Sequence, residues 1–265
     1  MHSYNPEKEE DRRGVIEGIQ EAFKLGITYF DTAESYGSGA SESIFGEGLA
    51  GIAPEDIFLA SKVTPSREKK VRSAASVRES LENSLKRLRR DYIDLIQVHG
   101  SYYSDEQAQE ILKKDSVVDG LEKARNEGLV KYIGFTIEAQ NTALERFINC
   151  DRFDTMQIQY NLLFQHPYDP YFKCGCLYQA KEKNLGVAAM RTVTSGIFQK
   201  WIQMVNPGNT FNYNPALVQF VLSSPFIDVA LLGMRSAKRV RENVEICDDL
   251  GGRIDIHALH YRIVD

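Results

Sequence analysis

An α/β fold with a parallel β-sheet is predicted for this chain of 265 residues. Three features of the sequence support it. Short apolar segments alternate with amphipathic segments of helical period along nearly the whole chain, as in proteins built from strand and helix repeats. No linker, low-complexity run or change of composition interrupts this alternation, so we expect one domain over residues 1–265. Polar or reactive side chains follow nearly every apolar segment, which favours a closed barrel with its active site at the carboxyl ends of the strands.

Seven strands are expected, each a short apolar run. Their predicted ends are Asp31, Lys62, His99, Phe135, Tyr160, Met190 and Leu232. An open, doubly wound sheet is the alternative to a barrel. It is disfavoured because no GxGxxG fingerprint follows the first apolar run, as it does in dinucleotide-binding domains of that kind.

Helices are expected between the strands, where apolar side chains recur three and four positions apart. Val77, Leu81, Leu85 and Leu88 show this spacing. The other expected helices lie near residues 15–25, 41–49, 118–128, 141–148, 178–183, 215–222 and 237–250. Residues 100–115 and 194–214 are expected to form long loops.

The first of eight barrel strands has no counterpart at the start of the sequence, which opens on a polar segment followed by a helix. Two interpretations compete. Either the upstream strand is missing from this chain, which we favour, or residues Met1–Tyr4 supply a makeshift edge. An unpaired strand edge destabilises a sheet and invites association.

Composition excludes several classes of protein. The net charge of −5 and the pI near 5.7 disfavour nucleic acid as the main partner, because phosphate binding needs a basic surface. No apolar run reaches the length that spans a membrane, and the start lacks the apolar region of a signal peptide. Four cysteines in a chain of this size indicate reduced, cytoplasmic thiols. Cys174 and Cys176 lack convincing further ligands, so no metal site is expected.

Four residues at or near successive strand ends carry the chemistry that we expect: Asp31, Tyr36, Lys62 and His99. A lone tyrosine is a poor acid, with a pKa of about 10, and a nearby ammonium favours its phenolate. An aspartate would orient that ammonium, and a histidine beside the phenol would bind a substrate oxygen. Together they would protonate a carbonyl oxygen while a cofactor delivers hydride to its carbon.

Each of these residues also has a purely structural interpretation. Asp31 could cap a turn, Tyr36 could pack on the rim of the barrel, Lys62 could be a solvated strand end, and His99 could be a core histidine. Their occurrence together favours the catalytic interpretation.

The sequence resembles the aldo-keto reductase family. The resemblance rests on the motif GITYFDTAxxYG over residues 26–37, on Ser61-Lys62, and on the spacing LxxLxxDYIDLxxVH over residues 85–99. The segments EGLVKYIG at 127–134 and GMRS at 233–236 fit later family passages. The resemblance implies an eight-stranded TIM barrel of the aldo-keto reductase type that reduces a small-molecule aldehyde or ketone with NADPH, more rarely NADH. It makes Asp31, Tyr36, Lys62 and His99 the catalytic tetrad, with Tyr36 as the general acid.

The resemblance also implies cofactor contacts. Gln157 matches the glutamine that holds the nicotinamide amide. The matches for the adenosine end of the cofactor are Arg235, Ser236, Arg239, Glu242 and Asn243. A guanidinium at the start of a helix suits a 2′-phosphate, which favours NADPH over NADH, although Arg235 and Arg239 could also be a solvated helix face.

Two positions depart from the family pattern. Thr136-Ile137 replaces the usual Ser-Asn, so Thr136 alone can donate to the carboxamide. Met190 replaces the aromatic residue that stacks on the nicotinamide, and methionine packs on a ring less rigidly. These departures, with the missing strand, keep two other interpretations open. One is a non-catalytic or regulatory nucleotide-binding barrel that acts through a protein partner, and the other is a degenerate fragment.

Overall fold

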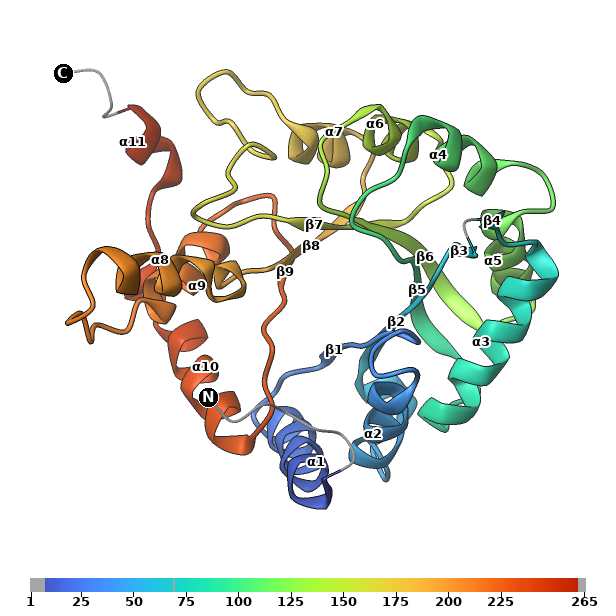
Figure 1. Cartoon of the computed structure of the whole chain (residues 1–265), viewed down its shortest axis with the longest axis horizontal. Coiled ribbons are helices and arrows are strands. Elements are labelled where there is room, and N and C mark those ends of the chain that lie inside the picture. The colour runs from blue at the N-terminus through green and yellow to red at the C-terminus, as the bar shows by residue number, and fades with distance from the viewer. Residues whose placement is uncertain (1–7, 69, 262–265) are drawn as a thin grey trace. The chain divides into compact units, whose positions relative to one another are not determined.

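A computed structural model describes residues 8–68 and 70–261 (Figure 1). The contacts between residues divide the chain into two compact units. The first contains the described residues up to Asp154 together with Met234–Arg241, and the second contains Thr155–Gly233 and the described residues from Glu242 onward. Among the described residues, no helix is long and apolar enough to cross a membrane.

The first unit contains four parallel strands in the order β1-β2-β5-β6. These are β1 (Tyr29–Asp31), β2 (Phe58–Val63), β5 (Ile93–Val98) and β6 (Val130–Ile137). The helices of this unit are α1 (Glu9–Lys24), α2 (Ala40–Gly48), α3 (Ala74–Leu88), α4 (Asp105–Leu112), α5 (Val117–Asn126) and α6 (Thr142–Asn149). A 3-10 turn, η1 (Pro54–Asp56), precedes β2, and a small antiparallel hairpin of β3 (Ser66–Arg67) and β4 (Lys70–Val71) follows it.

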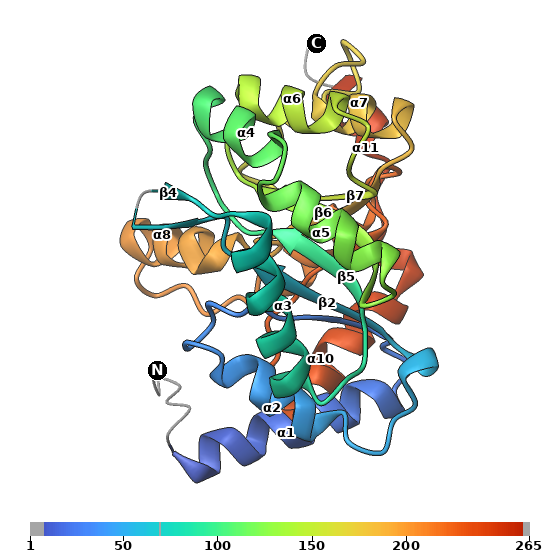
Figure 2. The same ribbon diagram turned by 90° about the vertical axis from the view of Figure 1, so that its right-hand side faces the viewer.

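The core of this unit lies between the strands and the helices that follow them. Every residue of β5 is buried, as expected for a central strand of a parallel sheet that is covered on both faces. Helices α3 and α5 pack side by side outside the strands, which both views show (Figures 1 and 2). Their buried faces carry the apolar side chains at helical spacing, among them Val77, Leu81, Val118 and Leu121.

The second unit contains three parallel strands in the order β7-β8-β9. They are β7 (Thr155–Gln159), β8 (Gly186–Met190) and β9 (Val229–Ala230). Its helices are α7 (Cys176–Glu182), α8 (Ile197–Val205), α9 (Asn214–Leu222) and α11 (Ile256–Tyr261), with the 3-10 turns η2 (Thr194–Gly196) and η3 (Leu250–Gly252). Helix α10 (Ala237–Asp248) begins in the first unit and ends in the second.

The seven predicted strands are all present, and each helix expected from apolar spacing has a counterpart. Two expectations were wrong. The segments 100–115 and 194–214, expected to be loops, contain α4 and α8. Helix α4 begins with a capping box in which Ser104 and Gln107 satisfy each other's backbone N–H groups, and this local signal overrides its polar composition.

Two alternatives were predicted for the start of the chain, a missing strand and a makeshift edge, and the described residues bear on only part of this prediction. Among the described residues, α1 is the first element, and the makeshift edge considered for Met1–Tyr4 lies outside the described residues. The expectation of one domain over residues 1–265 stays a prediction.

Close packing of α2 on α3 predicts a large effect of a small substitution. A methyl group built on Gly46 of α2 would overlap the carbonyl oxygen of Arg87 and lie 3.0 Å from the carbonyl carbon of Leu88. We expect Gly46→Ala to destabilise the protein by roughly 1–3 kcal/mol, because backbone atoms of α3 must move. Urea unfolding measures this. Gly14→Ala in α1 is the control: its methyl would lie 3.7 Å from the Arg235 carbonyl oxygen, so no loss of stability is expected. Equal unfolding midpoints for the wild type and Gly46→Ala would contradict the packing described.

Candidate active site

The first unit brings together the four residues predicted to carry the chemistry. Asp31 is the last residue of β1, Lys62 lies near the end of β2, and His99 directly follows β5. Parallel pairing aligns these positions: Asp31 lies opposite Ala60, and the His99 N–H donates to the Val63 carbonyl oxygen at 2.9 Å. Tyr36 lies in the loop between β1 and α2. The site therefore forms at the carboxyl edge of neighbouring parallel strands.

Lys62 is the buried centre of this group. Its side chain is 0% exposed, and its ammonium donates to Asp31 Oδ1 at 2.5 Å and to the Thr32 carbonyl oxygen at 2.7 Å. A buried ammonium is costly unless it is paired and hydrogen-bonded, and both conditions hold here. Burial raises the pKa of the Asp31 carboxyl, while the Lys62 charge and its hydrogen bond oppose this rise. These contacts hold the Lys62 ammonium in a fixed position beneath the β1–α2 loop.

Tyr36 lies against both Lys62 and His99. The Lys62 ammonium is 5.0 Å from the centroid of the tyrosine ring. The ring of His99 meets that of Tyr36 edge to face, with centroids 5.5 Å apart and planes at 80°. The tyrosine is 42% exposed, so a substrate can reach it from solvent. A phenolic hydroxyl, a fixed cation and an imidazole are thus grouped within one short loop and two strand ends.

His99 is neutral at physiological pH. Its pKa is lowered from 6.5 to about 4, chiefly by burial and also by the Lys62 charge, while Glu34 opposes the change. Its Nδ1 lies 3.1 Å from the hydroxyl oxygen of Ser35. A neutral imidazole has one N–H donor and one acceptor nitrogen, so this contact bears on which nitrogen carries the proton.

Two hydrogen-bonded carboxylates, one buried and one partly buried, support the loop from behind, and the sequence analysis did not identify either of them. Glu42, in the first turn of α2, is 0% exposed. It accepts hydrogen bonds from the Ser61 hydroxyl at 2.5 Å and from Arg87 Nε at 2.7 Å. Ser61 directly precedes Lys62, so this network links α2 and α3 to the strand that carries the ammonium. The signal in the sequence was a glutamate in the first turn of a helix with few charged residues.

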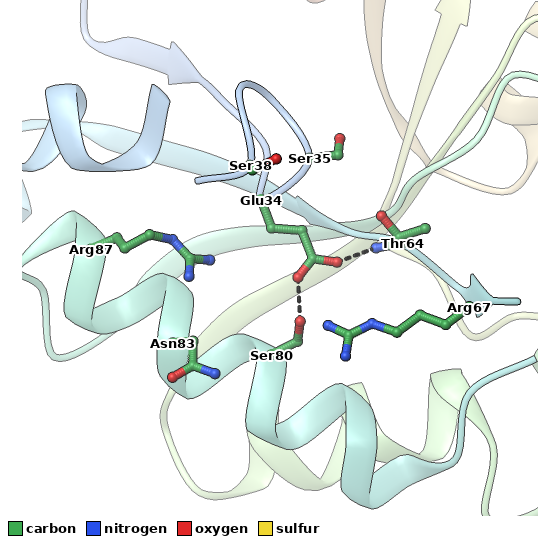
Figure 3. Close-up of a pocket in the computed structure, with 8 residues that line it drawn as sticks. All are labelled: Glu34, Ser35, Ser38, Thr64, Arg67, Ser80, Asn83 and Arg87. Carbon is green, nitrogen blue, oxygen red and sulfur yellow. Dashed lines mark hydrogen bonds between the residues drawn. The ribbon is translucent and has the colours of Figure 1, made fainter. Parts of the chain in front are cut away.

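Glu34 is the second of these carboxylates. It accepts from the Thr64 N–H at 2.7 Å and from the hydroxyl of Ser80 in α3 (Figure 3). It also pairs with Arg72 at 3.3 Å. It lines a polar pocket of about 340 Å³, into which Arg67 and Arg87 also extend (Figure 3). Its contacts tie the start of the loop to α3 and to the end of β2.

The residues expected at the adenosine end of a cofactor lie around the start of α10. Ser236 precedes this helix of 12 residues, and its hydroxyl accepts from the Arg239 N–H at 3.4 Å. The segment is held against α1, since a methyl on Gly18 would lie 3.3 Å from the Ser236 backbone and Arg241 pairs with Glu21 at 2.5 Å. Two exposed arginines, Arg235 and Arg239, with a hydroxyl at a helix start are a donor set that fits a phosphate.

The residues expected near the nicotinamide fit less evenly. The buried hydroxyl of Thr136 donates to the Gly100 carbonyl oxygen at 2.7 Å and accepts from the Gly100 N–H at 2.9 Å. To donate to a carboxamide instead, the Thr136 hydroxyl would have to break its hydrogen bond to the Gly100 carbonyl oxygen. In the second unit, Gln157 Nε2 lies 3.6 Å from the sulfur of Met190. That long contact to a weak acceptor is readily exchanged for a better partner. Glu242 and Asn243, in α10, also belong to the second unit.

The sequence is similar to those of known oxidoreductases. The model of the Aldo/keto reductase family matches residues 1–216. The chain belongs to this family. It is similar to YqkF, an oxidoreductase of Bacillus subtilis, with 23% identity over 269 residues that cover 89% of this chain and 82% of that protein. It is 33% identical to L-galactose dehydrogenase of Arabidopsis thaliana over 135 residues, which cover 50% of this chain and 40% of that protein.

A solved structure is similar over nearly the whole chain. It is an aldo/keto reductase of Klebsiella pneumoniae in complex with NADP and acetate, which is 25% identical. The TM-score is 0.72, and the match covers 97% of this chain and 87% of that one. This match confirms the predicted fold class, an α/β fold of the aldo/keto reductase barrel type.

The low pKa of His99 predicts a pH-dependent contribution to stability. The unfolded chain binds a proton at this histidine near pH 6.5, whereas the folded protein resists it until about pH 4. The unfolded state therefore holds more protons between these values, and stability falls as the pH drops through them. We expect the free energy of unfolding of the wild type, measured in urea, to fall by on the order of 2 kcal/mol more than that of His99→Asn when the pH is lowered from 7.5 to 4.5. Between pH 7.5 and 8.5 the difference between the two proteins should stay constant. Equal losses in the two proteins down to pH 4.5 would contradict a lowered pKa of His99.

Proposed function

We propose that this aldo/keto reductase catalyses the NADPH-dependent reduction of a small-molecule aldehyde or ketone to an alcohol. Family membership supports carbonyl reduction, and the similar protein from Klebsiella pneumoniae was solved with NADP. The observation that carries the proposal is the contact of Tyr36 with the paired Lys62 ammonium and with neutral His99. Asp31, Tyr36, Lys62 and His99 are the proposed catalytic residues.

Tyr36 is the general acid in this proposal. Its O–H bond breaks as a new O–H bond forms on the substrate carbonyl oxygen. The bound NADPH supplies the hydride that reaches the carbonyl carbon. Lys62 stabilises the negative charge left on the tyrosine oxygen, and it needs no reorganisation to do so, because Asp31 and the Thr32 carbonyl oxygen already hold it in place. Neutral His99 binds the substrate oxygen through one ring N–H and orients the carbonyl toward Tyr36.

Cofactor selection is assigned to the start of α10. Arg235 and Arg239 would neutralise the charge of a 2′-phosphate, and Ser236 would donate its hydroxyl to it. NADH lacks that phosphate, so these side chains favour NADPH. The remaining assignments, which rest on the resemblance to the family, are Thr136, Gln157, Met190, Glu242 and Asn243.

The role of Tyr36 is tested by Tyr36→Phe, which removes one oxygen and keeps the ring. We expect the rate of aldehyde reduction to fall by about 10²–10⁴-fold, the range typical of a lost general acid. Binding of NADPH, followed by quenching of tryptophan and tyrosine fluorescence, should change little. The rate is measured from the consumption of NADPH with a panel of aldehydes and ketones. Unchanged turnover in the variant would overturn the assignment. A wild-type chain that binds NADPH and reduces none of the panel would instead support a regulatory nucleotide-binding protein.

The selection of NADPH is tested by Arg239→Ala. Loss of a charged hydrogen bond to the 2′-phosphate should raise the Kd for NADPH by about 10-fold or more, while the Kd for NADH stays unchanged. Fluorescence titration with each nucleotide measures both. Lys238→Ala is the matched control, because it removes the same charge at the neighbouring position. If Lys238→Ala weakened NADPH binding as much as Arg239→Ala, general electrostatic attraction would explain the preference and the assignment of Arg239 would be wrong.

A further inference from the structure

We propose that Ser35 is a positioning residue that holds the ring of His99 in the tautomer with its proton on Nε2. The proposal deepens the proposed function and rests on it, since it concerns how His99 binds the substrate oxygen. The family match assigns no role to this serine, and the sequence analysis did not identify it. The observation behind it is the distance of 3.1 Å between Ser35 Oγ and His99 Nδ1.

The hydrogen bond joins two segments that are 64 positions apart in the sequence, the β1–α2 loop and the end of β5. Backbone hydrogen bonds hold the loop in a compact turn, because the Tyr36 N–H donates to the Ala33 carbonyl oxygen at 3.1 Å and the Ser38 N–H donates to that of Ser35 at 3.4 Å. Glu34, the residue before Ser35, is fixed to Thr64 and Ser80. The backbone at Ser35 is therefore held before it by the contacts of Glu34 and after it by the turn to Ser38, and it directs the Ser35 hydroxyl toward the imidazole.

The contact distinguishes between two tautomers only if the His99 ring is neutral, because a charged ring carries a proton on both nitrogens. With its pKa lowered to about 4, His99 carries a single ring proton at pH 7. The Lys62 charge disfavours protonation, and Glu34 opposes that effect only in part. If Ser35 donates a hydrogen bond to Nδ1, the ring proton must be on Nε2. If Nδ1 carries the ring proton, Ser35 must accept a hydrogen bond from it. A serine hydroxyl can do either, so the second ring nitrogen decides which arrangement is useful.

The substrate oxygen decides which of the two arrangements is productive. A carbonyl oxygen is an acceptor, and it needs a donor on His99 beside the proton that Tyr36 supplies. An Nε2 lone pair would face the lone pairs of that oxygen and repel it, whereas Nε2–H donates to it. Ser35 donating to Nδ1 selects the tautomer that binds, and the tautomer stays fixed when the substrate arrives. His99 touches the substrate in this scheme, and Ser35 acts through His99.

The tautomer itself is measured by nitrogen NMR of the full chain labelled with ¹⁵N-histidine, at pH 7 and without cofactor. The His99 signals are assigned by their absence in His99→Asn, among the five histidines of the chain. We expect wild type and Ser35→Thr to show a protonated Nε2 and an unprotonated Nδ1 that accepts a hydrogen bond. Ser35→Ala should give a mixture of tautomers. A protonated Nδ1 in wild type, or the same tautomer population in Ser35→Ala, would overturn the proposal.

Kinetics then test whether the tautomer matters for the reaction. We expect Ser35→Ala to lower kcat/KM by about 2- to 10-fold, the effect of one neutral hydrogen bond, with restoration in Ser35→Thr. Ser38→Ala is the matched control, because it removes a hydroxyl from the same exposed loop and should leave the rate unchanged. An unchanged rate in Ser35→Ala despite a mixed tautomer would overturn the positioning role.

The two proposals fail separately in these experiments. The NMR measurement needs no turnover, so it decides the tautomer even if wild type reduces no carbonyl compound. An active wild type that loses activity in Tyr36→Phe but keeps one His99 tautomer in Ser35→Ala would leave the proposed function standing and remove the role of Ser35.

Discussion

The burial of the Lys62 ammonium is the constraint on which the site depends. A fully buried cation is stable only if acceptors reach it, and here both acceptors come from the end of β1: Asp31 Oδ1 and the Thr32 carbonyl oxygen. The parallel register of β1 and β2 therefore has an electrostatic role as well as a packing role. It places the ammonium beneath Tyr36 and beside His99, where the same charge contributes to lowering the pKa of the imidazole.

The loop above this cation is fastened by hydrogen-bonded carboxylates. Glu42 is held by Ser61 and Arg87, while Glu34 is held by Thr64, Ser80 and Arg72. Between them, Ser35 and Tyr36 are exposed to solvent. A site that meets its substrate from solvent needs rigid support behind it, because small displacements of the reacting groups are costly. Polar networks that are fully satisfied provide such support with defined directions.

Much of this arrangement was readable from the sequence, and what was missed has physical reasons. Strands were found because their apolar runs are short and end in polar residues, as at Asp31 and Lys62. Helix α4 was taken for a loop because five of its eight residues are polar, although the capping residues Ser104 and Gln107 were a local signal. Helix α8 was missed although Ile197, Trp201 and Val205 recur four positions apart, and in the structure none of its residues is buried.

The sequence by itself determined the order of strands and helices, the family, and the residues at the strand ends, since all of these depend on local pattern and motif. Only the tertiary structure decided what surrounds those residues. Ser35 meets His99 across 64 positions, and Glu42 meets Arg87 across 45. The protonation state of His99 follows from burial and from the distance to Lys62, and neither quantity is a property of neighbours in the sequence. Long-range contacts and desolvation exist only once the chain has folded.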